Sequence, residues 1–308
     1  MPRRWVILGL FFWNGLAPPA DAWNKAGHMV SAAIAYAVLR DDAPAAIAGT
    51  VALLQSHPDY EPFWRKRLEE VAEEDRDLLL FMLAARWADD IRANPTFHHG
   101  EWHYINFPFK PVGQPESVRP KPPAEINILR AYALNSEQLK RATQPAERAV
   151  ALAWIFHLIG DVHQPLHTTS LFTEQYPEGD RGGNWFYIRV RPGAAVISLH
   201  AFWDDLIIGR DDFQAVRNRA TELRLRREFR RENLSELAET DFEKWAKGES
   251  FRLACEVAYW NGTLEGSATP ANGPVLPPGY VNLAKGVAER RIVLAGYRLA
   301  DVLARLRD

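Results

Sequence analysis

The sequence predicts an all-α protein that folds as a single domain. Apolar side chains recur at helical spacing along most of its 308 residues, and only one short stretch looks extended. Hydrophobic residues make up 47% of the chain and charged residues 25%, which is ordinary for a globular protein. No internal repeat or compositional shift suggests a domain boundary, so we expect one large core.

The expected helices follow one another with turn-rich connections between them. Residues 146–163 are the most apolar stretch and should form a central helix. Pro122 and Pro123 should open a helical segment that runs to about Lys140. The remaining segments with helical periodicity are 28–39, 43–55, 61–72, 75–90, 200–208, 211–230, 234–258 and 281–306.

Extended structure is expected only where residues 184–190 meet 196–199, as at most a short β-hairpin. The long connections are 92–123, 173–184 and 264–280. Long loops in a compact helical protein usually carry function.

The N-terminal segment has the layout of a secretory signal peptide. Arg3 and Arg4 precede an apolar run, which is followed by helix breakers and the small-residue pattern Ala20-Asp21-Ala22. The alternative is a membrane anchor, but the run is well short of the ~20 residues that span a bilayer. We expect removal of residues 1–22, which leaves the domain 23–308 with Trp23 as its first residue.

Charge and cysteine content narrow the class of protein. The formal net charge is −2, and it becomes −3 if residues 1–22, with two arginines and one aspartate, are removed. A weakly acidic chain has no general affinity for nucleic acid, so any attraction for phosphate must be local. The single cysteine, Cys255, excludes an intramolecular disulfide. Export without disulfides favours a periplasmic or secreted bacterial protein.

Histidine and aspartate recur in pairs that could bind a metal ion. His157 and Asp161 are four residues apart in the expected central helix, so both side chains leave one face. Pro165 then ends the helix and lets His167 fold back. His200 and Asp204 repeat the spacing. One such pair alone is more often a salt bridge or a hydrogen-bonded core group, but two pairs with a third histidine favour Zn²⁺. His163, on the opposite helix face, is expected to be structural or to support the ligands.

Further candidate ligands come earlier in the chain. Asp89 ends an apolar helix, and His103 follows a long connection. His28 lies five residues after Trp23. If cleavage follows Ala22, the free amino group and the carbonyl oxygen of Trp23 can chelate a metal together with His28.

These pieces, in this order, resemble the zinc-dependent single-strand-specific nuclease family that includes mung bean nuclease, in a superfamily shared with zinc phospholipase C. The resemblance covers essentially all of the chain after residue 22, and the stretch from His157 to His167 is its most specific part. The matching segments are Trp23-x4-His28, Trp87-Ala-Asp89, Trp102-His-Tyr104, His157-x3-Asp-x-His-Gln-Pro-Leu-His167, Gly182-Gly-Asn184, Leu199-His-x2-Trp-Asp204, 245–250 and 296–300.

The resemblance implies a multi-helix phospholipase C/nuclease-like fold and three zinc ions. Asp89, His103, His157 and Asp161 would hold one zinc. Asp161 would bridge to a second, held also by His28 and by the amine and carbonyl of Trp23. His167, His200 and Asp204 would hold the third. Three Zn²⁺ with three carboxylates give a local charge of +3, enough to attract phosphate to an acidic protein.

The resemblance also implies the reaction. The enzyme would hydrolyse single-stranded DNA and RNA to 5′-phosphate products, with zinc-activated water attacking phosphorus in line, and would also act as a 3′-nucleotidase. Arg92 and Asn184 would contact the phosphate beside Asp89. Tyr104 would stack on a base and Asn106 would bond it. Well-known members have Phe and Asp at these two positions, so the base preference stays open.

Two alternatives remain at this stage. One is a zinc phospholipase C-like lipid phosphodiesterase, although that branch spaces its first Trp and His more widely and has Glu at the position of Asp204. The other is a non-catalytic zinc-binding envelope protein, in which the ligands only stabilise the fold. In each case we expect a monomer without a stable protein partner. The basic run Arg224–Arg231 alternates with acidic residues and is expected to be a solvated helix face.

Overall fold

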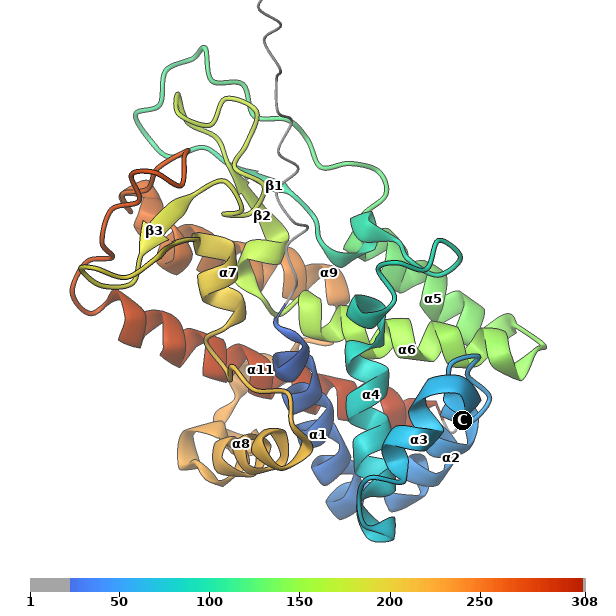
Figure 1. Ribbon diagram of the computed structural model, residues 1–308. Coiled ribbons are helices and arrows are strands. Elements are labelled where there is room, and N and C mark those ends of the chain that lie inside the picture. The colour runs from blue at the N-terminus through green and yellow to red at the C-terminus, as the bar shows by residue number, and fades with distance from the viewer. Residues whose placement is uncertain (1–22, 307–308) are drawn as a thin grey trace, which may run out of the picture.

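The computed structural model describes residues 23–306 and confirms a mostly helical single domain. Helices α1 (Lys25–Asp42), α4 (Arg76–Asp90), α6 (Pro145–Asp161) and α11 (Tyr280–Arg305) pack against one another at its centre (Figure 1). The expected signal peptide, residues 1–22, lies outside the described part of the chain. Within residues 23–306, no helix combines the length and the apolar character needed to cross a bilayer.

Smaller helices surround this central group. α8 packs on α1, and α5 packs on α6. A π-helical turn, Tyr60–Trp64, leads directly into α3. The outer helices are α2 (Pro44–Leu54), α3 (Arg65–Leu68), α5 (Ile128–Arg141), α7 (Leu199–Asp204), α8 (Phe213–Leu225), α9 (Phe242–Lys244) and α10 (Phe251–Leu253).

Helix α6 is the central helix that its composition predicts. Pro145 occupies its first turn, and every residue from Ala151 to Asp161 is buried. A helix that is buried all round must be packed on every side, which α1, α2, α4, α5 and α11 do. Its last two turns therefore place His157 and Asp161 inside the protein and not at its surface.

Several expected helix boundaries are wrong. The helix expected from Pro122 begins only at Ile128, because the Asn127 side chain accepts hydrogen bonds from the Leu129 and Arg130 amides and caps it there. The segment 234–258 is broken into 3₁₀, α and π-helical turns. The π-helical turn Trp245–Ser250 allows the neighbours Glu249 and Ser250 both to reach α11. The helices expected at 200–208 and 211–230 end at Asp204 and Leu225.

Two small sheets complete the fold. β3 (Tyr187–Arg189) and β4 (Val196–Ser198) pair antiparallel, with Tyr187 opposite Ser198, and confirm the expected hairpin. β1 (Phe107–Phe109) and β2 (Thr169–Leu171) form a second, parallel pair that we did not expect. Parallel strands are not joined by a tight turn, so no turn motif in the sequence predicts them. This pair joins the chain after Asn106 to the chain after His167.

A buried ion network joins segments 245–250 and 296–300, two of the segments that resemble the nuclease family. The Arg291 and Arg298 side chains are each 2% exposed and both bond Glu249. Arg298 also contacts His163 Nε2 at 2.8 Å and lies 4.5 Å from the centre of the Trp245 ring. His163 therefore has the structural role expected for it.

Replacing Glu249 should strongly destabilise the protein. Glu249→Ala leaves two buried guanidinium groups without their carboxylate, and we expect the free energy of unfolding to fall by about 3–5 kcal/mol. Urea denaturation measures this. Glu256→Ala removes an exposed partner of Arg252 and should cost at most about 1 kcal/mol. Equal effects of the two substitutions would contradict the assignment.

Candidate metal centre

Eight buried histidine and aspartate side chains meet beside the end of α6. They form three groups in which ligand atoms lie within 4.8 Å of one another. Two of the groups share His157, and we call their members together the first cluster. We call the remaining group the second cluster. The first cluster is His28, Asp89, His103, His157 and Asp161, and the second is His167, His200 and Asp204. The sequence predicted all eight, although the structure does not separate the first cluster into two sets.

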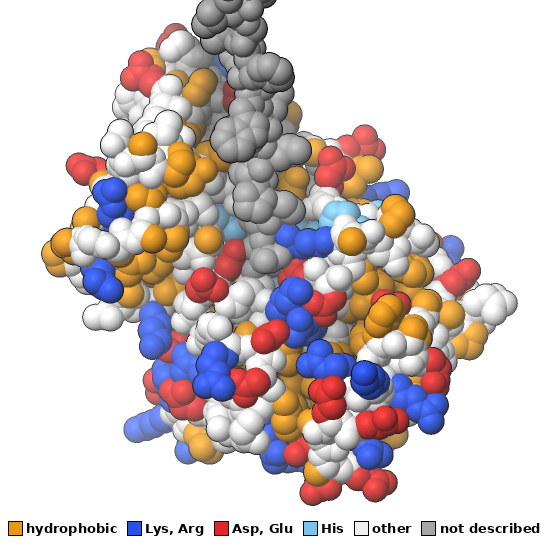
Figure 2. Space-filling model, in the orientation of Figure 1, with side chains coloured by type: hydrophobic (Ala, Val, Ile, Leu, Met, Phe, Trp, Pro, Cys, Tyr) orange, Lys and Arg blue, Asp and Glu red, His pale blue; other side chains and the backbone are white. Residues whose placement is uncertain are grey.

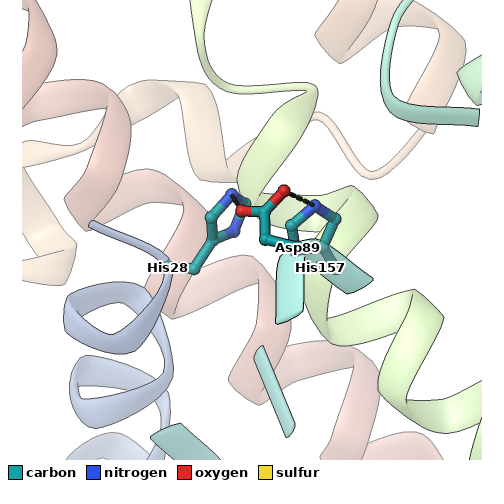
Figure 3. A group of neighbouring side chains, drawn as sticks. All are labelled: His28, Asp89 and His157. Atoms are coloured by element: carbon teal, nitrogen blue, oxygen red, sulfur yellow. Dashed lines mark ion pairs between the residues drawn. The ribbon is translucent and has the colours of Figure 1, made fainter. Parts of the chain in front are cut away.

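The first cluster collects side chains from three central helices and, for His103, from the 3₁₀ turn Gly100–His103. Figure 3 shows the Asp89 carboxylate from α4 between His28 of α1 and His157 of α6. Its oxygens lie 4.0 Å from His28 Nε2 and 3.9 Å from His157 Nε2. On the other side, Asp161 Oδ2 lies 3.1 Å from both His157 Nε2 and His103 Nδ1. Asp161 Oδ1 lies 3.3 Å from His28 Nε2, so Asp161 touches every histidine of the cluster.

The second cluster lies next to the first. His167 Nε2 is 3.1 Å from His200 Nε2, which is 3.5 Å from Asp204 Oδ2. Gln164 donates a 2.7 Å hydrogen bond to the other oxygen of Asp204. His167 Nδ1 lies 3.8 Å from Asp161 Oδ1, and this contact joins the two clusters.

Backbone carbonyl groups orient three of the histidines. Nδ1 of His157, His167 and His200 lies 2.8, 2.7 and 2.6 Å from the carbonyl oxygens of Ala85, His103 and Gly182, respectively. Each Nδ1 must carry a proton and donate it, so in the neutral ring Nε2 presents a lone pair to its cluster. This is the arrangement of metal-binding histidines. Burial also lowers the pKa of His28 and His167 and favours their neutral form.

Two glycines make room for this arrangement. A Cβ on Gly160 would lie 2.5 Å from His28 Nδ1, so any side chain there would displace His28. Gly182 has a φ of +61°, and a Cβ on it would collide with the Leu166 carbonyl oxygen. Only glycine can bring this turn close enough for its carbonyl to hold His200.

The donor set fits a metal ion. Five buried atoms of the first cluster have no hydrogen-bond partner, which is costly unless a cation binds them; they are His28 Nδ1 and Nε2, Asp89 Oδ2, His103 Nε2 and Asp161 Oδ1. Ligands at 2.0–2.1 Å from a tetrahedral ion are about 3.3 Å apart, close to the 3.1 Å contacts of both clusters. Burial opposes a proton on His157, yet Asp161 and Asp89 raise its pKa to about 9. The buried carboxylates therefore require positive charge.

The chain at Trp23 is held against both clusters. The Trp23 side chain is 0% exposed, and its indole donates a 3.1 Å hydrogen bond to the Gly160 carbonyl. The next residue, Asn24, donates its amide to the Asp204 carbonyl at 3.3 Å and caps α1 through Gly27. These contacts hold the Trp23 indole against the residue before Asp161 and the Asn24 amide against Asp204.

The other predicted site residues lie around the clusters. Arg92 donates a 2.9 Å hydrogen bond to Asp89 Oδ1. Tyr104 is 39% exposed and has an extended backbone directly after His103, and Asn106, two residues further on, is partly buried. Asn184 donates a 2.8 Å hydrogen bond to the Arg181 carbonyl, in the turn that contains Gly182.

Gln164 and Gly182 stand in the motifs that match the nuclease family, but the sequence did not predict their supporting roles or that of Gly160. These roles depend on partners far away in the chain, which no local pattern predicts. Arg181, which stacks 4.0 Å over Trp185 in the same turn and has a φ of +57°, was also missed.

Outside the clusters, His57 is a buried histidine with a different role. It is 3% exposed and stacked 4.3 Å from Trp64, and its Nδ1 accepts a 3.0 Å hydrogen bond from the Asp59 amide. Burial lowers its pKa to about 3. It is therefore neutral in the folded protein at every pH above that value.

His57 should contribute to acid unfolding. Because the folded pKa lies below the unfolded value of about 6.5, stability is fully present above pH 6.5 and is lost as the pH falls toward 3. Between pH 7 and pH 4 we expect His57 to account for a loss of about 3 kcal/mol. In His57→Phe, which keeps a ring against Trp64, the midpoint of urea denaturation should fall less over this range. The same pH dependence in both proteins would contradict this role.

Comparison with known proteins agrees with this geometry. Residues 23–308 match the family model described as S1/P1 Nuclease. The chain is 27% identical to Endonuclease 4 of Arabidopsis thaliana over 333 aligned residues, which cover 99% of this chain and 95% of the plant protein. It is 24% identical to Endonuclease 3 of the same plant, and the alignment covers 99% of this chain and 95% of that protein. It is 25% identical to Endonuclease 5 of the same plant, with 99% of this chain and 96% of that protein covered.

Proposed function

The chain belongs to the S1/P1 nuclease family and is a hydrolase that acts on nucleic acids, and we propose that it cuts single-stranded DNA and RNA with three zinc ions. The products would carry 5′-phosphates, and 3′-nucleotides would lose their phosphate at the same site. The observation that carries the proposal is the pair of clusters, in which oriented Nε2 lone pairs and buried carboxylates face one another without enough hydrogen-bond donors.

Three zinc ions can be assigned to the clusters. The first zinc would be held by Asp89, His103, His157 and Asp161. The second would be held by Asp161, His28 and the amine and carbonyl of Trp23. The third would be held by the second cluster. Mixed imidazole and carboxylate ligands suit zinc better than magnesium or calcium. When bound, zinc lowers the pKa of a water molecule and stabilises negative charge on phosphate oxygens.

The protein's own groups would position the substrate. Arg92, held by Asp89, can donate to a non-bridging phosphate oxygen, and Asn184 offers a side-chain amide as a second donor. Tyr104 presents a partly exposed ring for a base, and Asn106 can bond the edge of that base. A base must leave its stack to reach Tyr104, which costs little in a single strand and more in a duplex.

The proposal includes export. Cleavage of a signal peptide after Ala22 would produce the amino group that the second zinc requires, and the family match begins at residue 23. The enzyme would then act in the periplasm or the medium, as a monomer.

The test uses exported protein whose first residue has been sequenced and whose metal content has been measured. We expect about three zinc ions per chain, cleavage of denatured DNA and RNA, slower cleavage of duplex DNA, and release of phosphate from 3′-AMP. Hydrolysis of phosphatidylcholine alone would favour the phospholipase alternative. Zinc-loaded protein that cleaves neither nucleic acid nor 3′-AMP would favour a non-catalytic role.

A further inference from the structure

A second concave site lies against the end of α4 that carries Asp89. It is a cavity of about 620 Å³, which is in the size range of small-molecule sites. Leu83, Arg86, Trp87 and Asp90 line it, and their i, i+3, i+4, i+7 spacing places them on one face of the helix. Asp89 leaves a different face of the same turn toward the first cluster. None of the predicted metal ligands lines the cavity.

Aromatic rings dominate the outer wall of the cavity. Phe63 lines it although its side chain is 63% exposed, while the neighbouring Trp64 is only 5% exposed. Both belong to the π-helical turn Tyr60–Trp64, a local geometry that is frequent at functional sites. Opposite them, Trp87 is fixed by a 2.7 Å hydrogen bond from its indole to Asp59. An exposed phenylalanine ring beside two indoles is a stacking surface.

Of the two arginines among the described residues that line the cavity, Arg86 is firmly paired and Arg67 only weakly. Arg86 is engaged by Asp90 and Asp211, each at 2.8 Å. Among the residues that the structure describes, 23–306, Arg67 pairs with Glu70 alone, at 3.3 Å, with side chains 47% and 59% exposed, and such surface pairs are weak. Arg67 can therefore turn to a phosphate group at the mouth of the cavity.

We infer that this cavity binds a nucleobase of the substrate strand, several nucleotides from the phosphate that is cut. The inference rests on the proposed nuclease function. The base stacks on Phe63, and Arg67 pairs with an adjoining phosphate. Because stacking does not depend on the identity of the base, the site adds affinity for long strands without adding sequence preference.

The position of the cavity favours this occupant over an unrelated ligand. The two sites lie on different faces of one helix, so about 10 Å or more separates them, the length of roughly three stacked nucleotides. Figure 2 shows hydrophobic side chains with Lys and Arg as well as Asp and Glu around them over the region of α3 and α4, on a face where histidine is also visible. A strand lying on this face can reach both sites, whereas a dinucleotide can fill only one.

Kinetics with strands of two lengths test the inference. In Phe63→Ala and Arg67→Ala we expect kcat/KM for a ten-nucleotide single strand to fall about ten-fold relative to kcat/KM for a dinucleotide, through KM. Arg65→Ala, on the same short helix but paired with Glu61 and outside the cavity, is the charge control. Leu225→Ala, which removes a 75% exposed apolar side chain on α8, is the control for Phe63. In both controls, the ratio of kcat/KM for the ten-nucleotide strand to kcat/KM for the dinucleotide should equal that of the parent protein.

A binding measurement separates this inference from the proposed function. In a Tyr104→Ala background, adenosine should quench tryptophan fluorescence saturably, because Trp64 and Trp87 line the cavity, and adding Phe63→Ala should abolish the quenching. Absence of quenching, or an equal loss of kcat/KM on both strands, overturns the inference even if the protein is an active nuclease. A protein that quenches with adenosine but cuts no strand contradicts the proposed function and leaves a nucleoside-binding cavity.

Discussion

Asp161→Asn should lower kcat/KM for single-stranded DNA by roughly a thousand-fold, the largest loss we expect from one substitution outside the N-terminus. Asp161 lies 3.1 Å from two histidines and 3.3 Å from a third. It is 0% exposed, and although burial favours its neutral form, His157, His103 and His28 hold its pKa well below the usual range. Asparagine keeps the shape but removes the charge, so the first cluster should lose most of its affinity for zinc.

Metal analysis and activity should change together in this variant. We expect at most one zinc per chain, retained by the second cluster, while circular dichroism still shows a folded helical protein. Asp41→Asn is the control, because Asp41 is a surface carboxylate that pairs with Arg224. Full zinc content with full activity in Asp161→Asn would contradict the assignment of Asp161 as the bridging ligand.

Extra residues before Trp23 should have a comparable effect. An extension converts the α-amino group into an amide, which is a poor ligand, and places additional chain where Trp23 is packed against α6. The indole bond to Gly160 and the Asn24 bond to the Asp204 carbonyl leave the Trp23 backbone little freedom to move aside. We expect the loss of one zinc and a decrease in kcat of about 100-fold.

Proteolytic removal of the extension provides the matched control. Protein released so that it begins at Trp23 should recover the third zinc and its activity after zinc is added. An extended protein that holds three zinc ions and is fully active would show that Trp23 is not a ligand, without affecting the assignments of His28 and Asp161.

Much of the site could be predicted because its ligands lie in short motifs. The i, i+4 pairs His157–Asp161 and His200–Asp204 each use the geometry of a single helical turn, which is local. Asp89, His103 and His28 were candidate ligands from their places in the sequence, and the resemblance of the motifs to a nuclease family connected them to those pairs, which no spacing rule does. The structure brings all eight side chains together, as expected.

Helix boundaries and the unexpected sheet show the limit of local patterns. Asn127 and not Pro122 starts α5, because a side chain that caps two amides outweighs the preference of proline for a first turn. The π-helical turn Trp245–Ser250 was not predicted, because it forms where Glu249 reaches the two buried arginines of α11.

By itself, the sequence determined that this chain is helical, which residues can bind metal and which family they resemble, since these depend on composition and on spacing along a single helix or motif. Only the tertiary structure decided how the ligands are held. The carbonyl groups of Ala85, His103 and Gly182 orient the histidines, Gly160 makes room for His28, and the cavity opens between α4 and the π-helical turn. The physical reason is that each of these contacts joins groups far apart in the chain, whose separation in space is set by the packing of the core and not by any local pattern.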